Sequence, residues 1–180
     1  MKHLCFIAWL LFSLSIHAGV YGELEFGDDR QTVTQKLGKS QLVEQTVDNT
    51  YTARTGLNGI YKCKNDISGL ACRLYFNWDE QGGLNEITLR SDSLSEDLYT
   101  TELKRAWADA DALFSRIYNE PKQQAPYPPL SSFKAHKMMI THVWENSDTA
   151  TILVGTGMDK NQCFLFIRFI STKTNLTPQE

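Results

Sequence analysis

The chain shows the same order of sequence patterns twice: a helical pattern, followed by three runs with the alternation of β-strands. The first copy spans residues 26–90 and the second spans residues 94–171. Alternating apolar and polar residues are typical of strands that bury one face of an antiparallel sheet. We therefore predict an α+β fold of tandem helix-plus-three-strand antiparallel units, with the helices packed on one face of a meander sheet.

Two segments have helical spacing. In the first, Val33 and Leu37 lie four residues apart behind the acidic pair Asp28 and Asp29, and Gly38 is suited to ending the helix. The second segment ends before Pro121, which disfavours continuation. Its apolar positions recur at intervals of three and four residues. They predict a buried stripe formed by Tyr99, Leu103, Ala106 or Trp107, Ala110, Leu113 or Phe114, and Ile117.

Six runs have strand character, three in each half, and a polar stretch around residues 42–47 is a candidate edge strand. In the Val-Gly-Thr-Gly stretch, Gly155 and Gly157 are expected to form a hairpin turn at the end of a strand. A nucleotide-binding loop would need a helix directly after it, and none is indicated there. The six runs are residues 59–65, 70–78, 84–91, 137–146, 149–157 and 162–171.

The first 18 residues have the features of a secretory signal peptide: a basic start, a continuous apolar run, and small residues suited to cleavage between positions 18 and 22. The apolar run is shorter than the about 20 residues that span a bilayer, so we expect no membrane span after its removal. The rest divides into a first unit over 23–93, a second unit over 94–172 and a frayed tail over 173–180. These features predict a periplasmic or secreted protein.

The charge balance restricts the class of partner. The chain carries 18 Lys and Arg residues against 21 Asp and Glu residues, for a formal net charge of -3. Nucleic acids are bound through clustered basic side chains, so this composition offers no driving force toward a phosphate backbone. We therefore expect neither a nucleic acid nor a membrane surface as the partner.

Three cysteines follow the leader: Cys63, Cys72 and Cys163. In an exported protein a close pair such as Cys63 and Cys72 favours a disulfide, which would close a loop of about ten residues and stabilise the fold by roughly 2.5 to 3 kcal/mol. Free thiols are one alternative. A metal site is another, although no Cys-x-x-Cys or His-x-x-x-His spacing supports it. The redox state and the role of Cys163 stay open.

Few residues are candidates for catalysis. No Gly-x-Ser-x-Gly motif occurs, and beyond the leader the histidines are His136 and His142. Cys163 could act as a nucleophile with His142 as its base if their strands were neighbours, but a small buried cysteine is the simpler interpretation. Two histidines alone make a poor metal site. We expect no catalytic residues, no metal and no cofactor.

Two short motifs resemble a known superfamily. They are the opening helix FGDDRQTVTQKLGKS and the strand-turn-strand FNWDEQGGLNEITL. Both look like those of the β-lactamase-inhibitor-protein-like domains and the small outer-membrane-assembly lipoproteins, and the inhibitor-like branch has two such units in tandem. The resemblance implies an exported α+β fold that binds other proteins, although the lipidated cysteine of the lipoproteins is missing. The matching residues are Phe26, Gly27, Val33, Leu37, Gly38, Phe76, Asp79, Gly83, Leu84, Ile87 and Leu89.

Aromatic residues favour a binding role, because Trp and Tyr dominate the binding energy of many protein interfaces. Tyr75, Tyr127 and Trp144 are the candidates for a surface that another protein contacts. The leading hypothesis is an exported, non-enzymatic protein–protein interaction module, inhibitor-like or envelope-assembly-like. The alternative is a small-ligand-binding protein or small hydrolase with a pocket between helix and sheet.

Overall fold

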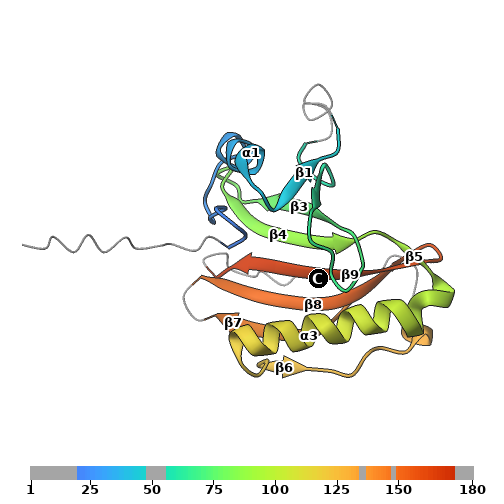
Figure 1. Cartoon of the computed structure of the whole chain (residues 1–180). Helices are drawn as coiled ribbons and strands as arrows, with labels where there is room; N and C mark the ends of the chain where they lie inside the picture. The colour runs from blue at the N-terminus through green and yellow to red at the C-terminus, as the bar shows by residue number, and fades with distance from the viewer. Residues whose placement is uncertain (1–19, 48–55, 134–136, 147–148, 173–180) are drawn as a thin grey trace, which may run out of the picture.

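The computed structural model describes residues 20–47, 56–133, 137–146 and 149–172 (Figure 1). The expected signal peptide over 1–18, the tail over 173–180 and His136 lie outside these residues. Within the described ranges, no helix is both long enough and apolar enough to cross a membrane.

One antiparallel sheet contains all nine strands of the described residues. The order across it is β1-β2-β3-β4-β9-β8-β7-β6, and the short β5 also pairs with β9. Figure 1 shows β9 between β4 and β8, where it joins the strands of the two halves of the chain. The strands are β1 (Val43–Gln45), β2 (Tyr61–Cys63), β3 (Cys72–Trp78), β4 (Leu84–Ser91), β5 (Leu94–Ser95), β6 (Gln123–Gln124), β7 (Met138–Asn146), β8 (Ala150–Asp159) and β9 (Gln162–Ser171).

The α+β class is therefore confirmed, and each of the six predicted runs contains a strand. The short β5 and β6 are strands that the sequence patterns did not predict. Each has only two residues, which is too few for a period-two alternation to be recognised.

The first helix, α1 (Arg30–Lys39), begins where its sequence indicates. The Asp29 carboxylate accepts a 2.7 Å hydrogen bond from the backbone N–H of Thr32, and this contact lowers the pKa of Asp29. Such a cap satisfies an amide that has no partner within the helix. Val33 and Leu37 are the buried residues of α1, and they pack against β2, β3 and β4.

The second helical segment consists of three consecutive parts: the 3-10 turn η1 (Glu96–Leu98), the π-helical turn η2 (Tyr99–Leu103) and α3 (Lys104–Tyr118). Of the alternatives Leu113 and Phe114, Phe114 is the buried one, and Leu113, about 100° around the helix from it, is 49% exposed. The expectation that Ile117 is buried is wrong, since it is 55% exposed. In the last turn, Tyr118 stacks on the Phe114 ring.

Both helices lie on the same face of the sheet. One core cluster joins α1 to β2, β3 and β4, and the other joins α3 to β7, β8 and β9. Ile87 on β4 belongs to the first cluster and pairs directly with Phe169 on β9, which belongs to the second. Directly paired residues share one face of a sheet, so we call the opposite side, which no described helix covers, the outer face.

The two glycines of the Val-Gly-Thr-Gly stretch lie beneath aromatic side chains of the outer face. The hairpin turn expected there is wrong, because Gly155 and Gly157 lie inside β8. A Cβ at Gly155 would lie 2.5 Å from the Phe166 ring, and a Cβ at Gly157 would clash with the Phe164 ring. These aromatic rings of β9 therefore lie directly over the glycine backbone of the neighbouring strand.

Candidate functional site

On β2, β3 and β4 the outer face carries polar, charged and aromatic side chains that alternate with the core residues, whereas on β9 its Phe164, Phe166 and Ile170 are buried. On β3, Cys72, Leu74 and Phe76 are buried against α1, so that Arg73 and Tyr75 point the other way. The same alternation gives Lys62 on β2, Thr88 and Arg90 on β4, and Arg168 on β9.

Three cations of the outer face lie opposite one another on adjacent strands. Lys62 pairs with Arg73, and Arg73 pairs with Arg90. We call Lys62, Arg73 and Arg90 the cation row. Like charges placed directly opposite each other destabilise a sheet, so these three residues reduce the stability of the fold unless nearby groups offset their repulsion.

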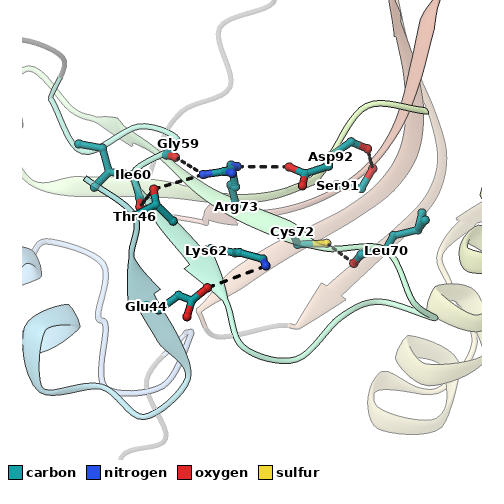
Figure 2. Close-up of polar contacts among 10 residues, drawn as sticks. All are labelled: Glu44, Thr46, Gly59, Ile60, Lys62, Leu70, Cys72, Arg73, Ser91 and Asp92. Atoms are coloured by element: carbon teal, nitrogen blue, oxygen red, sulfur yellow. Dashed lines mark hydrogen bonds and ion pairs between the residues drawn. The ribbon is translucent and has the colours of Figure 1, made fainter. Parts of the chain in front are cut away.

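Figure 2 shows the groups that contact Lys62 and Arg73 and so offset this repulsion. Their carboxylates, on Glu44 and Asp92, are partly exposed to solvent. The Lys62 ammonium lies 3.9 Å from Glu44, which is at the limit of an ion pair. Arg73 contacts Asp92 through Nε at 3.2 Å, and its Nη1 donates to the Thr46 hydroxyl and the Gly59 carbonyl oxygen. Exposed pairs of this kind contribute only about 0 to 1 kcal/mol to folding.

Arg90 has a different environment from the other two cations. Its guanidinium carbon lies 3.7 Å from the centre of the Phe164 ring, which is a cation–π contact. Within the described residues no carboxylate forms an ion pair with Arg90. The row therefore ends in a cation whose N–H groups no described carboxylate occupies.

Arg168, on the same face, differs from the cation row because it forms a bidentate ion pair with a carboxylate. Its Nε and Nη2 donate to the two oxygens of Glu86, both at 2.7 Å, and Thr88 donates to Glu86 as well. Burial raises the pKa of Glu86, but the hydrogen bonds from Arg168 and Thr88 together with the Arg168 charge lower it overall. This bidentate pair joins β4 to β9 and is structural.

Part of the cation row could have been found in the sequence. Lys62 precedes Cys63 and Arg73 follows Cys72, so any hairpin that aligns the two cysteines also aligns these two cations. Arg90 is a different case, because its position opposite Arg73 depends on the register of the next hairpin.

The three residues predicted to form a binding surface lie in different places. Tyr75 is half-buried on the outer face, and its hydroxyl would lie 3.3 Å from a Cβ at Gly59. Tyr127 is half-buried beside the helical segment, where it donates a 2.7 Å hydrogen bond to the Tyr99 carbonyl oxygen. Burial, followed by the neighbouring Tyr99, raises the pKa of Tyr127.

The surface prediction for Trp144 is wrong, because its side chain is 1% exposed. Its indole N–H donates to the Asn119 carbonyl oxygen at 3.0 Å, and its ring packs against Phe114 of α3. Trp144 belongs to the face of β7 that the helix covers. The structure therefore does not bring the three predicted surface aromatics together.

The register that pairs Lys62 with Arg73 also places Cys63 on β2 opposite Cys72 on β3. The structure nevertheless has both as free, buried thiols, so the predicted disulfide is absent from it. Each sulfur has another contact: Tyr21 donates to Cys63 at 3.4 Å, and Cys72 donates to the Leu70 carbonyl oxygen at 3.3 Å (Figure 2). Burial raises the pKa of both thiols, that of Cys72 to about 12.

A second candidate site surrounds a buried histidine on β7. The pairing of β7 with β8 shifts at Thr141, and both Thr141 and His142 are buried there. His142 Nε2 lies 3.5 Å from an Asp111 oxygen, and Nδ1 lies 3.1 Å from the Thr141 hydroxyl, which also accepts from the Trp107 indole. Burial lowers the pKa of His142 more than the Asp111 charge raises it.

His142 also lines a cavity of about 360 Å³ together with Gln124, Ala125 and Pro126. Its two ring nitrogens already face Asp111 and Thr141. Sequence reasoning named His142 but gave no indication of the cavity, because Gln124 and His142 are brought side by side only by the pairing of β6 with β7.

Cys163 and His142 do not form a nucleophile–base pair. Strand β8 lies between their strands, where Cys163 pairs with Met158 and His142 pairs with Val154. The Cys163 thiol instead lies 3.5 Å from the Leu94 carbonyl oxygen. Among the described residues, no group of three or more His, Cys, Asp or Glu could hold a metal ion.

No protein-family model, no curated protein and no solved structure matches this chain. Its function is therefore inferred from two features of the molecule, the outer face and the His142 cavity.

Proposed function

We propose that the chain is an exported, non-enzymatic protein–protein interaction module, inhibitor-like or envelope-assembly-like, that binds another protein through the outer face. One observation carries the proposal: both helices pack on the same face of the sheet, and the opposite face presents Tyr75 and the cation row. Tyr and Arg are enriched among the residues that dominate protein interfaces. The N-terminal signal pattern supports export.

We also propose that the two halves are copies of one structural unit. The order of elements supports this, since α1 precedes β1 to β4 and α3 precedes β6 to β9. The short β1 and β6 occupy the two outer edges of the sheet, and β4 and β9 pair at its centre. Each copy would then be a helix followed by an edge strand and three further strands, one strand more than the helix-plus-three-strand unit that the sequence patterns predict.

The test is affinity capture with Tyr75 variants. The protein, immobilised, is exposed to an extract of the cell envelope and surroundings of its source, and bound proteins are identified by mass spectrometry. Tyr75→Ala should lose a partner that the unchanged protein captures, whereas Tyr75→Phe, which keeps the ring, should retain it. A melting temperature close to that of the unchanged protein separates lost binding from lost folding.

Two results would refute the proposal. One is that the protein captures no partner reproducibly. The other is that Tyr75→Ala captures the same partner to the same extent, which would place the interface elsewhere.

The His142 cavity favours a second function, the binding of a small polar molecule beside β6 and β7. Concave sites with a few convergent polar groups are typical of ligand binding, and His142 and Gln124 supply polar groups here. Native mass spectrometry of the purified protein should then show a bound small molecule that is lost in His142→Leu. A ligand-free spectrum, or a ligand retained by the variant, would exclude this function.

A further inference from the structure

We propose that the cation row recognises an acidic α-helix of the partner protein, whose carboxylates lie about one helical turn apart. This inference rests on the proposed function, because it names the chemistry of the partner that the outer face binds. It depends on the spacing of Lys62, Arg73 and Arg90, on the loose pairing of their charges, and on the aromatic ring beside them.

The spacing of the row matches a helix better than an extended strand. Adjacent strands lie about 4.8 Å apart, so the backbone positions of Lys62 and Arg90 are about 10 Å apart. On a helix, residues i and i+4 have Cβ atoms about 5 to 6 Å apart, and residues i and i+7 are separated by about 10.5 Å along the axis. On a strand, residues i, i+2 and i+4 would span about 13 Å.

The two ends of the row, Lys62 and Arg90, are available for a partner because their present contacts are weak, whereas Arg73 between them contacts Asp92, Thr46 and Gly59. Lys62 and Glu44 lie 3.9 Å apart, and the carboxylates of both Glu44 and Asp92 are more than half exposed. Arg90 lies over the Phe164 ring, and among the described residues no carboxylate pairs with the edge of its guanidinium, which can bind a carboxylate with two hydrogen bonds. Arg168, which is held by both oxygens of Glu86, offers no such edge.

The flanking acids favour discrete carboxylates over a continuous phosphate surface. Glu44 and Asp92 stand beside the row, and the chain as a whole has a formal net charge of -3. A nucleic acid or an anionic membrane would place phosphates against these acids as well as against the cations, and repulsion would then offset part of the attraction. Tyr75, two residues from Arg73 on the same strand, adds an aromatic contact beside the row.

The probe is a synthetic alanine-rich helical peptide with glutamates at positions i, i+4 and i+7. Its control has the same composition, with the glutamates spread around the helix. Fluorescence anisotropy measures the dissociation constant of each labelled peptide for the whole protein. The first peptide should bind at least tenfold more tightly than the control, and its affinity should fall as salt rises.

Variants of the row identify the binding residues. Lys62→Gln and Arg90→Gln should each weaken binding of the matched peptide about tenfold, which is the effect of losing one hydrogen-bonded charge. Arg116→Gln, which removes the same charge from the exposed surface of α3, should change it less than twofold. Melting temperatures within a few degrees of the unchanged protein show that the variants are folded.

Several outcomes would overturn the inference. Equal affinity for the two peptides would exclude recognition of a helical face, and equal effects of Arg116→Gln and Arg90→Gln would exclude the row. Tighter binding of single-stranded oligonucleotide or phosphatidylserine vesicles, lost in Arg90→Gln, would assign the row to phosphates. If Tyr75→Ala abolishes partner capture but Lys62→Gln and Arg90→Gln do not, the proposed function stands and this inference falls. If none of the three affects capture, both fall.

Discussion

Replacing Gly155 by alanine tests the packing of the outer face directly. An added Cβ would collide with the Met139 carbonyl oxygen on β7 and would lie 2.5 Å from a carbon of the Phe166 ring. Neither neighbour can move freely, because the first is backbone within a paired strand and the second belongs to a side chain that is 1% exposed. The substitution should therefore force a shift of the strand or of the ring.

The magnitude follows from the kind of atoms that must move. Overpacking a core typically costs about 1 to 3 kcal/mol, and the upper end applies where a backbone atom is involved. For Gly155→Ala we expect a loss of about 3 kcal/mol in the free energy of unfolding. In a protein of this size each 1 kcal/mol shifts the melting temperature by about 2 to 4 °C, so the midpoint should fall by about 6 to 12 °C.

Urea unfolding followed by circular dichroism measures this change, and Gly38→Ala is the matched control. Gly38 lies in α1 with nothing within 4 Å of an added Cβ. Alanine there should raise stability by about 0.5 to 1 kcal/mol, since alanine loses less backbone entropy in a helix than glycine does. A Gly155→Ala protein as stable as the unchanged one would show that the Phe166 ring does not lie over β8.

Three further predictions follow from buried titratable groups. The folded pKa of Glu86 is lowered, so its stabilising effect is present above the unfolded pKa of about 4.3 and is lost as pH falls through the folded value. Glu86→Gln should therefore reduce the decrease in urea midpoint between pH 6 and pH 3. An unchanged decrease would contradict the Glu86–Arg168 ion pair. The folded pKa of His142 is also lowered, but for a base this means that the unfolded chain binds the proton first, so stability is complete above about pH 6.5 and declines below it. His142→Gln should remove that decline between pH 7 and pH 5, and its persistence would contradict the burial of the imidazole. Cys63 and Cys72 should react slowly with a thiol reagent in the folded protein and rapidly in urea; fast labelling of the folded protein would contradict their burial, and no labelling in urea would show that they are oxidised.

Sequence patterns predicted the helices and the longer strands because those patterns are local. Asp29, Val33 and Leu37 specify the start and the buried side of α1 within eight residues of one another. The strands β3 and β4 were recognisable from alternation alone. The two-residue strands β5 and β6 were not, because they exist only through their pairing with β9 and β7.

The alternation of apolar and polar residues could not predict which aromatic side chains are exposed. A period of two separates two sides of a strand but does not say which side a helix will cover. Tyr75 and Trp144 have similar surroundings in the sequence, yet Tyr75 lies on the outer face and Trp144 lies under α3. The bulge at Thr141 adds to the difficulty, because it changes the alternation of β7 between Ile140 and His142.

The sequence by itself determined the α+β class, the order of the two helical segments and the six predicted strand runs, and the absence of an evident catalytic motif, since these depend on residue type and short-range spacing. The tertiary structure decided that β9 pairs with β4 and so joins the two halves into one sheet, that Cys63 and Cys72 lie on paired strands as thiols, and that Lys62, Arg73 and Arg90 form a row. Strand register joins residues that are far apart in the chain, and a shift of one residue would send each side chain to the other face. The cation row therefore exists only in the folded sheet.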